Sequence, residues 1–204
     1  IDRTEQTRAQ AHDSFLLMLE DALQNLDSAE AICETGAVLL GRHLHASRCA
    51  YAIVDADEDA FEIRADYVDR TAHVTGRFRF SDFGSDLLEC MRENRPWVVQ
   101  DTEAHAPPMR FDDPGYRRMG TRAVLSAPLH KAGRLVAVIG VHQVQPRVWT
   151  SAEIELVRLV AARCWESMER ASAQSDLARS EARLRELADA MPQIVFTATP
   201  EGHV

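Results

Sequence analysis

Three polar side chains that could bind a small molecule lie before, within or at the end of one apolar hairpin. His142 ends the second arm of that hairpin and could donate a hydrogen bond to a carbonyl or carboxylate. Asp82 could accept hydrogen bonds from ring nitrogens, and Arg122 could bind an acidic group. Each also has a structural interpretation, namely a satisfied strand-end histidine, a carboxylate near a helix N-terminus and a paired surface arginine. The structural interpretation is the simpler one for His142 and Arg122, and for Asp82 the two are about equal.

Cysteine and histidine spacing gives no sign of a metal site. The four cysteines, Cys33, Cys49, Cys90 and Cys164, are widely spaced and form no Cys-x-x-Cys pair, so neither zinc nor a disulfide framework is indicated. A redox role for Cys90 or Cys49 would need a neighbouring base, and none is evident. Lone histidines such as His73 or His105 have no spacing diagnostic of haem ligation.

Composition narrows the class of protein. The chain has 204 residues, 46% hydrophobic residues and a net charge of -9. Clustered Lys and Arg are needed to bind phosphate backbones, so a nucleic-acid partner is not expected. No apolar run approaches the roughly 18 residues of a membrane span, and no signal peptide opens the chain. We expect a cytoplasmic protein without membrane contact in these residues, and the missing initiator Met suggests a piece of a longer chain.

The elements that must position these side chains form an antiparallel sheet. The apolar run Leu135–Val141 is of strand length and rich in β-branched residues, which predicts a central strand buried on both faces. Its hairpin partner is Thr121–Leu129, joined to it by the turn His130–Gly133. A loop without periodicity, Thr102–Gly120, precedes the hairpin. Further strands are predicted at 47–54, 61–67, 73–80 and 97–99, with a short helix at 85–94.

Helices flank the sheet in sequence. An amphipathic helix is predicted at 4–26, and a second helix follows a capping box that begins at Asp27. A long helix starts at the capping box Thr150–Glu153. Its first apolar seam has the heptad spacing of a coiled coil, and a second seam is offset from it, so we expect a change of phase or of packing partner near 174–177. The first seam contains Ile154, Val157, Ala161, Cys164, Met168 and Ala171, and the second contains Leu177, Leu184, Leu187 and Met191. Apolar surface on both terminal helices predicts a parallel homodimer.

The order of elements and several short motifs resemble a GAF domain of the phytochrome type. The motifs are Tyr116–Ala123 with its Met119-Gly120 turn, Ser126–Leu129, His142-Gln143 before Pro146-Arg147, and Ser81-Asp82. The resemblance covers about residues 27 to 170 and implies an α+β fold, with an antiparallel sheet of about six strands, flanking helices and a ligand pocket. It implies a pocket containing Asp82, Phe83, Tyr116, Met119, Arg122 and His142. Arg117 and Arg118 could bind acidic groups as Arg122 could, but for all three arginines pairing with Asp112, Asp113 or Glu103 is the preferred interpretation.

The same resemblance bears on the cofactor. Many phytochrome-type domains attach a bilin through a Cys-His pair, and this chain has Phe111 and Asp112 where that pair would stand. A covalent bilin is therefore not expected, while a noncovalent tetrapyrrole or another small ligand stays open. The ligand itself is unknown.

The end of the chain, Ser180–Phe196 with Pro200-Glu201-Gly202, is similar to the start of a PAS domain. The expected organisation is an N-terminal helix at 1–26, a GAF domain at 27–149, a linker helix at 150–190 and a truncated PAS domain at 191–204. This order is typical of bacterial two-component sensor histidine kinases, so we expect a sensory module without kinase activity of its own. The alternatives are a ligand-free dimerisation module and, less favoured, a redox enzyme similar to methionine sulfoxide reductase.

Overall fold

The structure is a computed structural model that describes residues 3–104, 116 and 119–190. It has an α+β fold built on one six-stranded antiparallel sheet, as the sequence predicts, and the strands have the order β3-β2-β1-β6-β5-β4. The strands are β1 (Arg48–Val54), β2 (Ala60–Val68), β3 (Gly76–Arg79), β4 (Trp97–Val99), β5 (Ala123–Lys131) and β6 (Arg134–Gln143). The helices are α1 (Arg3–Leu23), α2 (Ala29–His43), the 3-10 turn η1 (Phe80–Phe83), α3 (Ser85–Arg92) and α5 (Ser151–Ala190).

The predicted hairpin is β5–β6, and β6 occupies an interior position between β1 and β5. The turn is tighter than the predicted four residues, because Lys131 already pairs with Arg134. Ala132 and Gly133 both have positive φ values, 51° and 78°, as a two-residue hairpin turn with the twist of the strands requires. The predicted strand at 73–80 is likewise shorter than expected, since its last residue begins η1.

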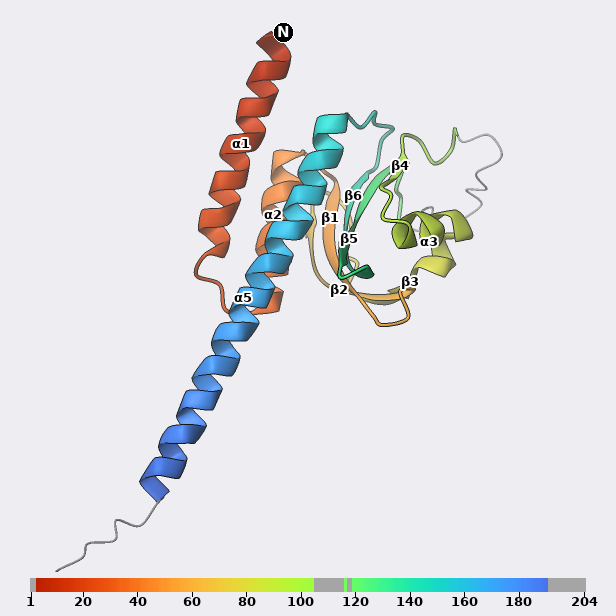
Figure 1. Ribbon diagram of the computed structural model, residues 1–204. Coiled ribbons are helices and arrows are strands. Elements are labelled where there is room, and N and C mark those ends of the chain that lie inside the picture. Colours follow the sequence, from red (N-terminus) through yellow and green to blue (C-terminus); the bar gives the residue numbers. More distant parts are fainter. Residues whose placement is uncertain (1–2, 105–115, 117–118, 191–204) are drawn as a thin grey trace, which may run out of the picture.

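Helices cover the two faces of the sheet unequally (Figure 1). On one face lie α1, α2 and α5, and on the other lie η1 and α3. The core behind the sheet contains Tyr51, Leu125 and Ile139 together with Leu40 and Val160 from the helices. A second, smaller core on the η1 and α3 side contains Phe61, Met91 and Val138. Successive residues of the interior strands therefore alternate between two separate cores.

The long helix α5 begins at the predicted capping box. The Thr150 hydroxyl accepts from the Glu153 backbone N–H at 3.2 Å, and Glu153 accepts from the Thr150 N–H at 2.8 Å. For α2 the predicted cap is wrong by one residue, because Ser28, not Asp27, caps the helix and accepts from the N–H of Ala31.

The first apolar seam of α5 packs inside the domain and does not face a second chain. Val157, Ala161 and Cys164 are completely buried against α2 and the back of the sheet. The interpretation of this seam as a coiled-coil interface is therefore wrong. Beyond Ala171 every described side chain of α5 is exposed, and the predicted second seam begins in this projecting part.

Candidate functional site

A cavity lies on the η1 and α3 side of the sheet. Its floor is formed by the sheet, with residues from β1, β2, β3, β5 and β6, and its wall by η1, α3 and residues 116 and 119. The cavity has a volume of about 70 Å³. A cavity of this volume can hold a few water molecules or a small ligand, and it is small compared with a tetrapyrrole. The lining is mainly apolar and includes Phe61, Phe78, Phe80, Phe83 and Tyr116, with Arg48, Ser126 and His142 as polar members.

The structure brings four of the six predicted site residues together. Phe83, Tyr116, Met119 and His142 all line the cavity, and the Tyr116 ring lies 5.5 Å from Phe83 and 6.3 Å from His142 between ring centroids. Asp82 is exposed and is not part of the lining.

Arg122 is also absent from the cavity lining and is a paired arginine, although only Glu103 of its observed partners was predicted. It forms a bidentate ion pair with Asp101, with both distances 2.8 Å, and a further pair with Glu103 at 3.1 Å. Phe111, Asp112, Arg117 and Arg118 are outside the described residues, as is His105. Ligand binding by the predicted set remains a prediction.

The polar end of the cavity contains a buried ion pair that the sequence reading missed. Arg48 is 3% exposed, and its Nε lies 3.9 Å from the Asp66 carboxylate, whose side chain is 1% exposed. Asp66 also accepts from the Val74 N–H and contacts His73 Nδ1 at 2.7 Å, while Arg48 donates to the Ala72 carbonyl. A charged residue in an otherwise apolar strand such as β1 was the signal that could have revealed this pair.

His142 lies next to Arg48 across the β1–β6 pairing. Its Nδ1 is buried and has no hydrogen-bond partner among the described residues. Burial and the neighbouring Arg48 charge lower the pKa of the His142 imidazole from 6.5 to about 3, so the ring is neutral at pH 7. Gly140 makes room for this ring, because a Cβ there would lie 3.2 Å from Nε2. In a neutral imidazole one ring nitrogen donates a hydrogen bond and the other accepts one, so Nδ1 can take either part depending on the tautomer.

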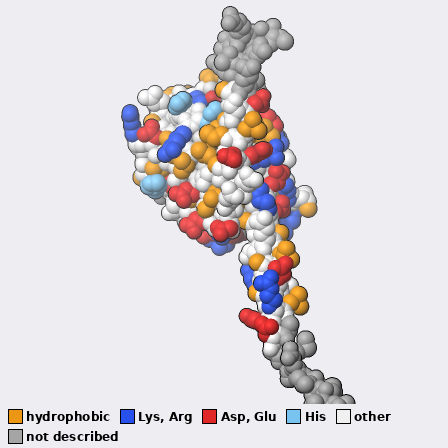
Figure 2. All heavy atoms as spheres, turned by 90° about the vertical axis from the view of Figure 1, so that its left-hand side faces the viewer, with side chains coloured by type: hydrophobic (Ala, Val, Ile, Leu, Met, Phe, Trp, Pro, Cys, Tyr) orange, Lys and Arg blue, Asp and Glu red, His pale blue; other side chains and the backbone are white. Residues whose placement is uncertain are grey.

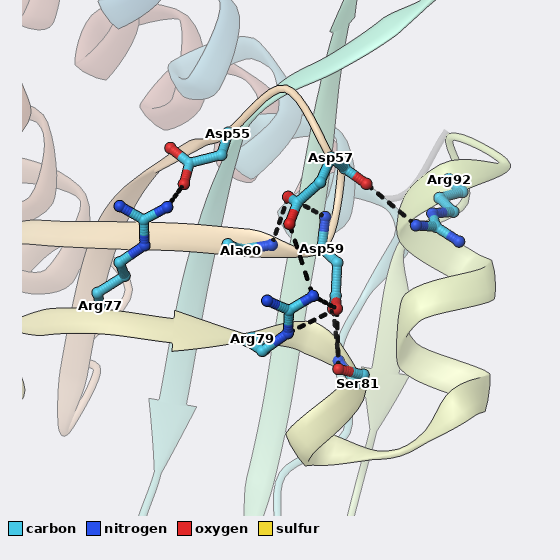
Figure 3. Close-up of polar contacts among 8 residues, drawn as sticks. All are labelled: Asp55, Asp57, Asp59, Ala60, Arg77, Arg79, Ser81 and Arg92. Carbon is cyan, nitrogen blue, oxygen red and sulfur yellow. Dashed lines mark hydrogen bonds and ion pairs between the residues drawn. The ribbon is translucent and has the colours of Figure 1, made fainter.

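The rim of the cavity is tied to the acidic turn between β1 and β2 (Figure 3). Asp59 accepts from the backbone N–H and hydroxyl of Ser81 and from Arg79. Burial by itself raises the pKa of the Asp59 carboxyl, but these hydrogen bonds outweigh it and lower the pKa. Arg92 from α3 donates to the Asp57 carbonyl. The turn thus holds η1, with the lining residues Phe80 and Phe83, and α3 in place.

One strand connects the cavity to the helix layer. Val138, Gly140 and His142 of β6 line the cavity. The alternate residues Ala137, Ile139 and Val141 pack in the opposite core together with α5. This arrangement follows from the two-residue repeat of a strand.

The segment after β6 is fixed at several points. The Arg147 guanidinium lies over the Trp149 ring at 4.5 Å, donates to the Leu44 carbonyl at the end of α2, and contacts Glu153 in the first turn of α5. The Trp149 indole N–H donates to the Val99 carbonyl. These contacts hold the segment between β6 and α5 against the end of α2, against β4 and against the first turn of α5.

The thiols do not form a reactive site. All four cysteines are buried and free, and three of them, Cys33, Cys49 and Cys164, lie in the core behind the sheet. Burial raises the pKa of Cys33 to about 11 and raises those of Cys49, Cys90 and Cys164 as well. A thiolate is the reactive form of cysteine, so these thiols are poor nucleophiles at pH 7. No cluster of three or more potential metal ligands occurs among the described residues.

The model of the GAF domain family matches residues 28–168. This chain is a GAF domain. No curated protein sequence matches it significantly. The GAF fold agrees with solved structures that share little sequence with the chain.

Three solved structures illustrate this similarity. Bacteriophytochrome RpBphP3 from R. palustris superposes with a TM-score of 0.70 at 17% identity over 86% of this chain, which spans 41% of that protein. A phycoerythrobilin-bound GAF domain from a cyanobacterial phytochrome gives 0.67 at 14% identity over 80% of this chain and 97% of that one. Free methionine-R-sulfoxide reductase from Neisseria meningitidis, with its substrate, gives 0.61 at 16% identity over 80% and 91%. At these identities the similarity shows the fold alone.

Proposed function

We propose that this GAF domain is the sensory module of a signal-transduction protein and that it relays the state of its cavity through α5. The observation that carries the proposal is the two-sided role of β6, which lines the cavity with one face and packs with α5 through the other. A small ligand that favours one arrangement of β6 would bias the position of α5, provided that it binds the two arrangements with different affinity.

Dimerisation of α5 is the second part of the proposal. Leu177, Leu184 and Leu187 are 62%, 64% and 57% exposed and follow heptad spacing on the projecting part of the helix. Figure 2 shows hydrophobic side chains among charged ones along this part. Most of the stability of a helix in a protein comes from packing of its apolar face, so pairing with a second copy would both bury the leucines and stabilise the helix.

The parent protein is proposed to be a two-component sensor histidine kinase. The support is the sequence of residues 180–202, which is similar to the start of a PAS domain, and the direction in which α5 leads away from the GAF domain. Within the described residues no helix has a long enough apolar stretch to cross a membrane. The ligand-free dimerisation module differs from this proposal only in the role of the cavity.

A crosslinking experiment distinguishes the proposed relay from the ligand-free dimerisation module. Single cysteines replace Leu177 or Leu184, and Arg179→Cys, off the seam, is the control. Oxidation should crosslink the seam positions, which face each other in the proposed dimer, and should not crosslink the control position. The native thiols should not interfere, because they are buried.

Filling the cavity with Val138→Phe, or with Ala50→Leu from another strand, should change the ratio of crosslinking at 177 to that at 184. An unchanged ratio in both filled variants would contradict the relay and favour a ligand-free dimerisation module.

Two direct assays address the cofactor and the enzyme alternative. An absorption spectrum with added biliverdin or haem should show no stoichiometric complex, because the cavity between the described residues is small compared with a tetrapyrrole. A free methionine sulfoxide reductase assay, with Cys90→Ser as its variant, should show no thiol-dependent turnover. A bound chromophore or such turnover would replace the proposal by the corresponding alternative.

A further inference from the structure

The cavity has an aromatic end and a polar end. Phe61 stacks on Phe80 at 4.3 Å and lies 6.3 Å from Phe83, between ring centroids. Phe61 pairs with Val54 at the end of β1, whereas Arg48 stands at the start of that strand, across from His142. Ser126 pairs with Gly140, one step along the same face from His142. A ligand that spans the cavity therefore meets aromatic rings on one side and three hydrogen-bonding side chains on the other.

The charge at the polar end is already balanced. Arg48 and Asp66 form a fully buried pair of opposite charges, and the neighbouring His142 is neutral at pH 7. A carboxylate or phosphate would add a negative charge for which no further described cation lines the cavity. An uncompensated buried charge is strongly unfavourable.

Two buried polar atoms at the polar end of the cavity have no hydrogen-bond partner among the described residues. The Arg48 Nε–H is buried without a hydrogen-bond partner among the described residues, since 3.9 Å to Asp66 is too long for one. His142 Nδ1 is likewise buried and has no hydrogen-bond partner among the described residues. Buried polar atoms in native proteins nearly always find a partner, and a ligand or ordered water in the cavity could supply one. The floor thus offers a donor, a neutral imidazole and a hydroxyl, without net charge.

We infer that the cavity binds an uncharged, single-ring aromatic compound that carries one neutral hydrogen-bonding group, such as an amide, carbonyl or phenol. The ring lies among the phenylalanines, and the polar group meets Arg48, Ser126 and His142. The small volume of the cavity favours a single ring over larger ring systems, and the balanced charge of the polar end disfavours a carboxylate of the same shape. This inference rests on the proposed sensory function and specifies the ligand class for that cavity.

The test compares benzamide with benzoate, which have nearly the same shape and differ in charge. Each is titrated into the ¹⁵N-labelled 204-residue chain at pH 7, and backbone amide shifts are followed. We expect benzamide to shift amides of β5 and β6 around Ser126 and His142 and to bind at least about tenfold more tightly than benzoate, given the cost of burying a charge. Equal or tighter binding of benzoate would overturn the inference, and so would absence of cavity shifts with both compounds.

Two variants test the assigned contacts. Ser126→Ala and His142→Leu should each weaken benzamide several-fold and leave the binding of toluene, which has no polar group, unchanged or stronger. Thr75→Ala, exposed and outside the lining, should bind both as the wild type does. Equal weakening of benzamide and toluene would mean that the two side chains only maintain the shape of the cavity, which contradicts their role in selectivity.

Failure of the ligand class and failure of the proposed function have different signatures. If benzoate is preferred, or neither probe binds, while cavity filling still changes the crosslinking of α5, the ligand class is wrong and the relay stands. If benzamide binds as expected but neither filling variant changes the crosslinking ratio, the cavity binds a ligand that α5 does not sense.

Discussion

At the scale of single residues, His142 connects the chemistry of the cavity to the stability of the fold. The folded-state pKa of His142, about 3, lies below its ordinary value of 6.5. The unfolded chain therefore takes up a proton at a pH where the folded chain does not, and stability falls as the pH drops from 6.5 toward 3. Above pH 6.5 this contribution is fully present.

The variant His142→Gln removes this titration. At pH 5 the protonation of the unfolded state should cost the wild type about 2 kcal/mol of unfolding free energy relative to pH 7.5, and the variant should lack that loss. Urea unfolding at both pH values measures it. His45→Gln, at an exposed position, should keep the wild-type dependence. Identical pH dependence in wild type and His142→Gln would show that the ring is protonated without cost in the folded state.

Asp66 is the second residue whose role can be measured directly. Asp66→Asn leaves the Arg48 charge buried without its counter-charge, and we expect a loss of about 3 to 5 kcal/mol in unfolding free energy. The matched control is Asp69→Asn, whose ion pair with Arg70 is exposed. It should change stability by less than about 0.5 kcal/mol. A loss no larger than the control's would mean that the Arg48 charge is solvated or otherwise compensated.

At the scale of elements, the contact between α2 and α5 depends on a glycine. A Cβ built on Gly36 would stand 2.4 Å from the Cys164 Sγ, far inside van der Waals contact. Gly36 lies in the interior of α2, where alanine is favoured over glycine by about 1 kcal/mol on helix propensity. Close packing and helix propensity therefore oppose each other at this position.

Gly36→Ala should destabilise the wild type by about 1 to 2 kcal/mol, because overpacking outweighs propensity. In the Cys164→Ala background the same substitution should instead stabilise by up to about 1 kcal/mol, because the sulfur is gone. Thermal or urea unfolding of the wild type, the two single variants and the double variant measures the coupling between the two positions. Glu34→Ala, on the exposed side of α2, should cause no loss. The same sign in both backgrounds would contradict the close contact.

At the scale of the whole molecule, α5 has two parts with different roles. The part up to Ala171 belongs to the domain core, and the part beyond it makes no buried contact within the described chain. A chain that ends at Gln174 should therefore keep the unfolding free energy of the domain within about 1 kcal/mol. It should also sediment as a monomer at a concentration where the full chain is a dimer.

The predicted effects of truncation on stability and on dimerisation can be contradicted independently. A large loss of stability on truncation would mean that the projecting helix contributes to the domain, for example through the dimer. A truncated chain that still dimerises would place the interface on α1, where Leu17 and Met18 are 69% and 49% exposed.

The sequence by itself determined the elements, their order and the GAF family, because those depend on local signals. The capping box at Thr150, the β-branched run of β6 and the positions of Pro and Gly act over a few residues, and the structure agrees with them to within a residue or two at most boundaries. The grouping of Phe83, Tyr116, Met119 and His142 was also predicted, through motifs shared with the family.

Only the tertiary structure decided which apolar and charged surfaces are buried or paired within the domain. Both seams of α5 have similar spacing, yet the first is buried against α2 and the sheet and the second is exposed. Arg122 and Arg48 both lie near the start of a strand, yet Arg122 pairs with Asp101 at the surface. Arg48 instead pairs with the buried Asp66 at the polar end of the cavity. Burial and pairing depend on residues far apart in the chain, and sequence periodicity carries no information about those distances.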